Sequence, residues 1–167
     1  MPEEIVGKIA RKYMAHYLDA SFGSTSKNYV RLGKDLEEYS VDLNPDVNVF
    51  KNIIGETSFT HNGYQRGGAV APFYCEMGDP LFEKLQEIVD TEVQDDGLKT
   101  TAVEVHLWDA GSTTGTYTAY CQDVYVVPDS YGGDTSGYQI PFSVYHVGPR
   151  TVGTFTLSTK TFAPTNG

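Results

Sequence analysis

The sequence predicts an α+β domain that is mainly β, built as a β-sandwich or barrel with one flanking amphipathic helix. Two observations predict the strands: the chain has 17 Gly and 12 Tyr in 167 residues and is rich in Thr and Val, and most of its apolar segments are short and bounded by turn residues. A third observation predicts the helix, because only one stretch shows the 3.6-residue period of an amphipathic helix. With 40% hydrophobic residues, the chain has enough apolar side chains for a core.

The first strands are predicted at residues 14–19, 29–32 and 36–43. The third of these alternates, which is typical of a half-buried strand with an acidic outer face. Its apolar face carries Tyr39, Val41 and Leu43, and its outer face carries Glu38, Ser40 and Asp42. Four longer strands are predicted after the helix, at 101–108, 116–127, 138–147 and 151–158, with a turn at 148–150.

Residues 43–55 are predicted to form a loop. Asn44, Pro45 and Asp46 break the preceding strand, and pairing is expected to resume only near residues 53–56. The segment 46–52 is too long for a tight hairpin and is notably apolar. A loop with this many apolar side chains is expected to pack on its own domain or on a neighbouring molecule.

The helix is predicted to begin at Asp79, which can cap it, with Pro80 suited to its first turn. Asp95, Asp96 and Gly97 are expected to end it. The stripe that should face the core consists of Leu81, Phe82, Leu85, Ile88, Val89 and Val93.

Charge and cysteine content limit the classes of function. The net charge of −10 and the isoelectric point near 4.7 argue against a protein that grips phosphate backbones. No run of about 18 apolar residues suggests a membrane span, and the acidic start does not resemble a signal peptide. Cys75 and Cys121 are therefore expected to be reduced thiols in a chain made in the cytoplasm, although a bridge between them stays possible.

No pattern in the sequence indicates an enzyme, a cofactor or a metal site. His16, His61, His106 and His146 lie in none of the spacings typical of metal ligands. Cys75 has no basic neighbour in sequence that would lower its pKa. The segment 133–137 superficially resembles protease signatures, but its residues are those of a glycine-rich turn.

An ordered series of segments resembles the major tail protein, or tail tube protein, of tailed bacteriophages and prophages of Gram-positive bacteria. The resemblance runs from about Lys12 to Lys160, and no single motif in it is diagnostic alone. The segments are Tyr29-Val30-Arg31-Leu32-Gly33-Lys34-Asp35-Leu36, Leu43-Asn44-Pro45-Asp46, Lys51-Asn52-Ile53-Ile54-Gly55-Glu56-Thr57, Gly78-Asp79-Pro80-Leu81-Phe82 and Ser130-Tyr131-Gly132-Gly133-Asp134-Thr135-Ser136-Gly137-Tyr138-Gln139-Ile140-Pro141-Phe142.

The resemblance implies a structural virion protein that assembles into stacked hexameric rings, forming the hollow tube through which phage DNA is delivered. It divides the chain into an N-terminal arm (1–13), a tail tube domain (14–160) with an inter-ring loop (43–55), and a C-terminal tail (161–167). The implied partners are further copies of the chain, a tape-measure protein, and tail terminator or baseplate proteins. The implied location is the virion tail, assembled in the cytoplasm of the host bacterium.

Three sets of residues follow as candidates for roles in such a tube. Strand alternation nominates polar residues for the lumen: Glu38, Ser40, Asp42, Glu56, Ser58, Thr60, Gln139 and Ser143. The loop nominates residues for contact with the next ring: Asn44, Pro45, Asp46, Val47, Val49, Phe50, Ile53 and Ile54. Helix packing is assigned to Leu81, Phe82, Leu85, Ile88 and Val89. A one-residue error in register would turn the lumen set to outer solvent or to an intersubunit salt bridge.

Two alternatives stay open. The first is a related tube, the inner tube of a contractile tail, of a tail-like bacteriocin or of a secretion system. The chain is also compatible with a monomeric β-sandwich binding module of a phage baseplate, in which Trp108, Tyr117 and Tyr120 would stack on sugars. The sequence does not distinguish a contractile from a non-contractile tail.

Overall fold

The computed structural model describes residues 6–165 except 24, 34, 35 and 37. The first five residues of the predicted arm and the last two of the predicted tail therefore lie outside the described residues. Residues 6–13 run along the surface and include a short 3₁₀ helix, η1, at Arg11–Tyr13.

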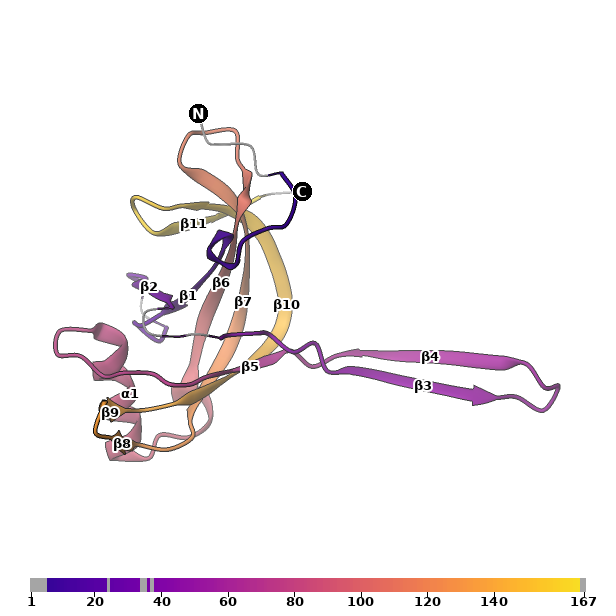
Figure 1. Cartoon of the computed structure of the whole chain (residues 1–167), viewed down its shortest axis with the longest axis horizontal. Coiled ribbons are helices and arrows are strands. Elements are labelled where there is room, and N and C mark those ends of the chain that lie inside the picture. Colours follow the sequence, from indigo (N-terminus) through magenta and orange to yellow (C-terminus); the bar gives the residue numbers. More distant parts are fainter. Residues whose placement is uncertain (1–5, 24, 34–35, 37, 166–167) are drawn as a thin grey trace.

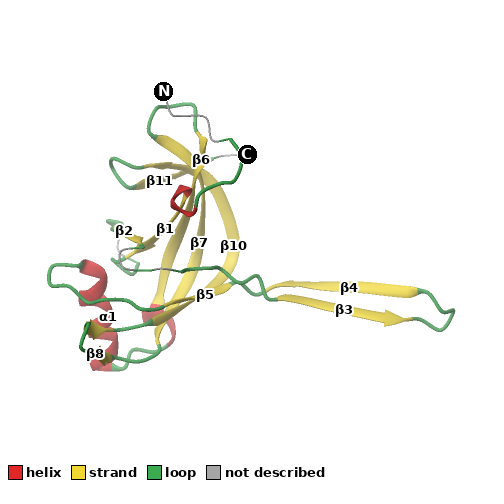
Figure 2. Cartoon of the chain, viewed as in Figure 1, coloured by secondary structure: helices red, strands yellow, loops and turns green. Residues whose placement is uncertain are grey.

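One curled antiparallel sheet forms the body of the molecule, in the strand order β11-β10-β7-β6-β1-β2, with β5 also paired to β10 (Figure 1). Its centre is made of three long strands, β6 (Lys99–Ala110), β7 (Thr116–Pro128) and β10 (Phe142–Thr156). The shorter strands are β1 (Met14–Asp19), β2 (Tyr29–Leu32), β5 (Gly67–Val70) and β11 (Thr161–Pro164). The predicted fold class, mainly β with one flanking helix, is confirmed (Figure 2).

Helix α1 (Pro80–Thr91) lies against one end of the sheet. The Asp79 side chain accepts a hydrogen bond from the Leu81 backbone N–H at 3.0 Å, and Glu92 closes the helix in the left-handed conformation. The helix buries Leu81, Leu85 and Ile88, while Phe82 and Val89 are half-buried. Among the described residues, no helix is long and apolar enough to cross a membrane.

The curled sheet has an apolar core on each of its faces. The core under α1, here called the helix-side core, contains Leu18 of β1, Val124 of β7 and Val144 of β10. The opposite core contains Val103 and Val105 of β6 with Phe155 of β10. Side chains alternate across a strand, so residues two positions apart share a face. This rule places His16, Glu104 and His146 on the same face as the helix-side core.

The predicted strand at 36–43 is wrong. Among its described residues, only Asp42 forms a bridge, opposite Gly67. The alternation is nevertheless physical: Tyr39 is 8% exposed, whereas Glu38 and Ser40 are exposed. Tyr39 packs its ring edge-on to His16 at 4.7 Å, so its burial comes from packing on the sheet rather than from membership in it.

The predicted loop at 43–55 is also wrong in its conformation. Residues Pro45–Lys51 form strand β3, and Thr57–Tyr64 form strand β4, which together make a long antiparallel hairpin. The predicted resumption of pairing at 53–56 falls instead in the turn of this hairpin. The break expected at Asn44 is present, because Asn44 has a positive φ of 43° immediately before β3 begins.

Two more differences concern the C-terminal half. The predicted turn at 148–150 lies inside β10, where the pairing with β7 passes from Val147 opposite Asp123 to Thr151 opposite Cys121. Four residue steps of β10 therefore span two of β7, which is a bulge. The predicted tail begins with β11, so the sheet extends to Pro164. The remaining elements are η2 (Asp95–Leu98), β8 (Gly132–Asp134) and β9 (Gly137–Gln139).

Candidate functional site

The β3–β4 hairpin projects away from the curled sheet (Figure 1). Every residue of β3 is exposed, and only two residues of β4 are half-buried. Most strands of a single domain bury at least one face, because apolar side chains gain free energy when they leave water. The hairpin buries neither face within its own chain and is therefore a candidate contact surface.

The two faces of the hairpin differ in character. Residues directly opposite each other in an antiparallel pair share a face, and Val49 lies opposite Phe59 while Val47 lies opposite His61. The ring of His61 contacts that of Tyr64 at 4.6 Å between centroids. We call this surface the apolar face of the hairpin; it consists of Val47, Val49, Phe59, His61 and Tyr64.

The other face of the hairpin is mainly polar. Asn48 lies opposite Thr60, and Phe50 lies opposite Ser58. The inter-ring candidates Val49 and Phe50 therefore point to opposite sides of the hairpin, and Ser58 and Thr60 share a side with Phe50.

Asn52 organises the turn at the tip of the hairpin. Its side-chain oxygen accepts hydrogen bonds from the backbone N–H groups of Ile54 at 3.1 Å and Glu56 at 2.9 Å. Gly55 takes the positive φ of 85° that the turn requires. Ile53 and Ile54 are left at the tip, 104% and 72% exposed.

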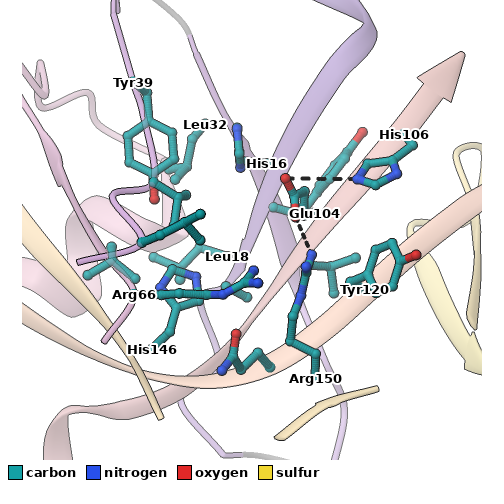
Figure 3. A pocket seen from close by; sticks show the side chains of 17 residues that line it. His16, Leu18, Leu32, Tyr39, Arg66, Glu104, His106, Tyr120, His146 and Arg150 are labelled. Atoms are coloured by element: carbon teal, nitrogen blue, oxygen red, sulfur yellow. Dashed lines mark hydrogen bonds and ion pairs between the residues drawn. The ribbon is translucent and has the colours of Figure 1, made fainter. Parts of the chain in front are cut away.

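A polar pocket of about 350 Å³ lies next to the root of the hairpin (Figure 3). The sheet register builds it, because His16 of β1 lies opposite Glu104 of β6, and Glu104 lies opposite Tyr120 of β7. His146 and Arg150 reach the pocket from β10, and Arg66 reaches it from the link between β4 and β5. Figure 3 shows these side chains converging from different segments of the chain.

Glu104 is the central acceptor of the pocket. It forms an ion pair with Arg150, and its other oxygen lies 3.9 Å from Nε2 of His106. The Arg150 guanidinium also lies over the ring of Tyr120, 4.2 Å from its centroid, in a cation–π arrangement. Stacking on Trp108 at 4.5 Å holds the ring of His106 in place.

Burial and the neighbouring cations keep two imidazoles neutral. The pKa of His16 falls from 6.5 to about 4, chiefly through burial and then through the charge of Arg11. Burial also lowers the pKa of His146, and Arg66 lowers it further. Both shifts favour the neutral form of the imidazole, and burial is the larger cause in each.

The structure spreads the predicted lumen residues over three regions rather than one. Glu38, Ser40 and Asp42 lie in the exposed segment before the hairpin, and Glu56, Ser58 and Thr60 lie on the hairpin. Gln139 belongs to β9, and the Ser143 hydroxyl on β10 donates a hydrogen bond to Asp129 at 2.8 Å. The predicted inter-ring residues, by contrast, all lie at the start of the hairpin, in β3 or in its turn.

No pattern in the sequence brings the pocket residues together. His16, His106 and His146 are distant in sequence and belong to separate predicted strands. One signal was available, because three of the pocket residues lie two positions from an apolar residue of the helix-side core: His16 from Leu18, Glu104 from Ala102, and His146 from Val144. Within the part of the chain that the structure describes, no group of three or more His, Cys, Asp or Glu is arranged to hold a metal ion. Cys75 and Cys121 are free thiols.

Comparison with known proteins gives a likeness of fold. No family model matches the chain, and no curated protein matches it in sequence. A solved structure described as the sheath/tube terminator of an extracellular contractile injection system, PVC, in its extended state, is similar to it with a TM-score of 0.54 and 9% identity. The similarity covers 89% of this chain and 98% of that one. At this identity the likeness is one of fold.

Proposed function

We propose that this chain is a structural subunit of a phage-tail-like tube and that copies of it assemble through the β3–β4 hairpin. The observation that carries this proposal is the apolar face of the hairpin. Phe59 is 65% exposed, Val49 60% and Tyr64 59%, although their cross-strand neighbours are also apolar or aromatic. Exposed apolar surface of this kind indicates a site of protein–protein contact.

The fold supports the class of assembly. The similar solved structure belongs to the end of a tube, and the series of segments described above resembles tail tube proteins. The edges of the curled sheet also suit assembly, since β2 and β11 each have one paired side among the described residues. Joining edges between subunits would remove exposed strand edges, which are otherwise a liability.

In the full proposal, six copies form a ring, rings stack into a tube, and the hairpin of one subunit contacts the next ring. The tube would surround a tape-measure protein during assembly and later pass DNA. The net charge of −10 per chain supports such a conduit, because a strongly basic lumen would hold the phosphate backbone. Glu38, Asp42 and Glu56 are the exposed carboxylates proposed for the lumen.

The experiment compares two pairs of substitutions on opposite faces of the hairpin. Val49→Ser with Phe59→Ser removes a directly opposite pair from the apolar face. Asn48→Ser with Thr60→Ser changes the corresponding pair on the polar face. Negative-stain electron microscopy and sedimentation velocity should show rings or tubes for the second variant and dispersed subunits for the first. Normal tubes from the first variant would contradict the role of the hairpin.

A second candidate function is that of a tail terminator, because the similar solved structure is described as a sheath/tube terminator. A terminator would form rings that stop at one or two layers, whereas a tube protein would polymerise further. The length distribution of particles from the purified chain separates the two. A monomeric sugar-binding module is less well supported, because His106 covers one face of the Trp108 ring.

A further inference from the structure

The cations of this acidic protein are concentrated in one place. The polar pocket and a second pocket of about 450 Å³ share His16, Leu32 and Tyr39 in their linings. Five of the 12 Lys and Arg of the chain line the two pockets, and among the described residues that line them, one acid accompanies these cations. The cations are Arg11, Lys12, Arg31, Arg66 and Arg150, and the acid is Glu104.

Glu104 is already occupied by Arg150 and His106. Arg11 donates to the backbone oxygens of Met14 and Tyr39, and Arg31 donates to that of Lys12. These bonds hold the two guanidinium groups in place without neutralising their charge. The positive charge of this region is therefore uncompensated within the described chain.

Among these cations, Arg66 is the one best placed to bind an anion. It is half-buried, yet its guanidinium donates no hydrogen bond and forms no ion pair to any residue that the structure describes. Its nitrogen atoms are not among the buried atoms that lack a partner, so the guanidinium is open to the pocket and can form charge-assisted hydrogen bonds to an anion there. The neighbouring Nδ1 of His146 is a buried atom that also has no hydrogen-bond partner.

We propose that the polar pocket binds a carboxylate and that an acidic segment of a second copy of this chain supplies it. Arg66 would form the bidentate contact, since its planar fork of donors matches a carboxylate. His146 would donate the second contact from Nδ1 as the neutral tautomer that carries its proton there. This inference rests on the proposed function, because it requires the chain to associate with itself.

Charge complementarity and position identify the second copy as the source. Outside the two pockets, the described surface is acidic; the stretch from Asp90 to Asp96 has four carboxylates and no Lys or Arg. The pocket also adjoins the hairpin that we propose as the assembly arm. The backbone N–H of Asp42 donates to the carbonyl of Gly67 at 2.7 Å, and the N–H of Gly67 donates to the carbonyl of Asp42 at 3.0 Å. Arg66 directly precedes Gly67 at this pair of hydrogen bonds. An anion bound at Arg66 would therefore fix the direction in which the hairpin leaves the sheet.

The test uses three variants of the full chain. Arg66→Gln removes the charge at the pocket, Arg66→Lys retains the charge without the fork, and Lys160→Gln removes the charge of an exposed residue in the β10–β11 turn. Sedimentation velocity would give the dissociation constant for self-association at pH 6.5 and at two salt concentrations. Melting temperatures should match among the variants, because the Arg66 side chain forms no bond to the described chain.

We expect Arg66→Gln to weaken self-association at least ten-fold and to reduce its salt dependence. Arg66→Lys should recover part of this loss, and Lys160→Gln should behave like the unmodified chain. Association of Arg66→Gln equal to that of Lys160→Gln would overturn the inference while leaving the hairpin proposal intact. Association that survives the apolar-face substitutions would overturn the hairpin proposal, and an unmodified chain that stays monomeric would overturn both.

Two probes separate the other sources of an anion. Citrate binding measured by calorimetry, dependent on Arg66 but without effect on self-association, would show a small-molecule site and contradict the inference. Binding of a labelled fifteen-nucleotide dT strand that is lost in Arg66→Gln, in a chain whose self-association is unchanged, would show a nucleic-acid site and contradict it equally.

Discussion

The curled sheet and the β3–β4 hairpin both alternate apolar and polar side chains, but the apolar side chains are buried in the sheet and exposed in the hairpin. In β6, Val105 is 0% exposed and pairs with Ala119 of β7, which is also fully buried. In β3, Val49 is 60% exposed and pairs with Phe59, which is 65% exposed. Other strands of the same curled sheet pack over the first pair, whereas the second pair stays exposed within the described chain. An alternating strand thus indicates which face is apolar without indicating whether the same chain covers that face.

The largest change in the free energy of unfolding is expected when a side chain of the helix-side core is truncated. Leu85 is fully buried in α1, so Leu85→Ala should lower the free energy of unfolding by about 2–5 kcal/mol, through lost burial and the cavity left behind. Urea denaturation followed by circular dichroism measures this loss. An unchanged midpoint would show that the helix contributes no closely packed layer.

Acid should destabilise the sheet through its buried imidazole. The pKa of His16 is about 4 in the folded chain against 6.5 when unfolded, so between these values the unfolded chain binds a proton that the folded chain does not. Stability is therefore complete above pH 6.5 and falls toward pH 4, by at most about 3 kcal/mol. The groups that face His16 are Arg11, Arg31, Glu104, His106, His146 and the ring of Tyr39.

His16→Gln should flatten this part of the pH profile, measured as the urea midpoint at pH 7, 6, 5 and 4. His61→Gln is the matched control, because His61 is exposed on the hairpin. Equal slopes for the two variants would exclude His16 as the source of the acid sensitivity.

The cap of α1 should have a smaller effect. Asp79→Ala removes the acceptor for the Leu81 N–H and should cost about 1 kcal/mol in unfolding free energy. Asp79→Asn, which retains an acceptor, should recover most of that loss. If the alanine and asparagine variants unfold at the same urea concentration, the cap contributes little.

The smallest effect is expected on the hairpin. Val49→Ser should change the unfolding free energy of the subunit by less than about 0.5 kcal/mol, as is usual for exposed positions. Dispersed subunits are the appropriate sample for this measurement. A loss as large as that of Leu85→Ala would show that the hairpin folds back onto its own chain, and the contrast between the two regions would disappear.

Sequence patterns predicted the parts of the fold that local chemistry determines. The cap at Asp79 and the apolar stripe predicted α1, and β2 has the predicted bounds of Tyr29–Leu32. Patterns failed where a distant partner decides. The alternation around Tyr39 reflects packing against His16 rather than pairing, and the segment after Pro45 is a strand only because β4 lies beside it.

The polar pocket could not be predicted from the sequence, because it too depends on which strands lie side by side. Its residues come from β1, β6, β7 and β10, and register alone sets His16 opposite Glu104 and Glu104 opposite Tyr120. The hairpin residues are consecutive, so the sequence indicated a candidate contact surface there even though it did not predict the conformation.

The bulge in β10 affects both the curvature of the sheet and the ion pair at Glu104. The two additional residue steps between Val147 and Thr151 bend the strand and let Arg150 turn toward Glu104. They also bring the Gly148 carbonyl to the side-chain nitrogen of Gln122, 2.8 Å away. Removing Gly148 and Pro149 would give β10 and β7 equal numbers of residues here, but it would also change the position of Arg150 relative to Glu104. The curvature of β10 and the ion pair at Glu104 therefore depend on the same residues, and a substitution or deletion that changes one also changes the other.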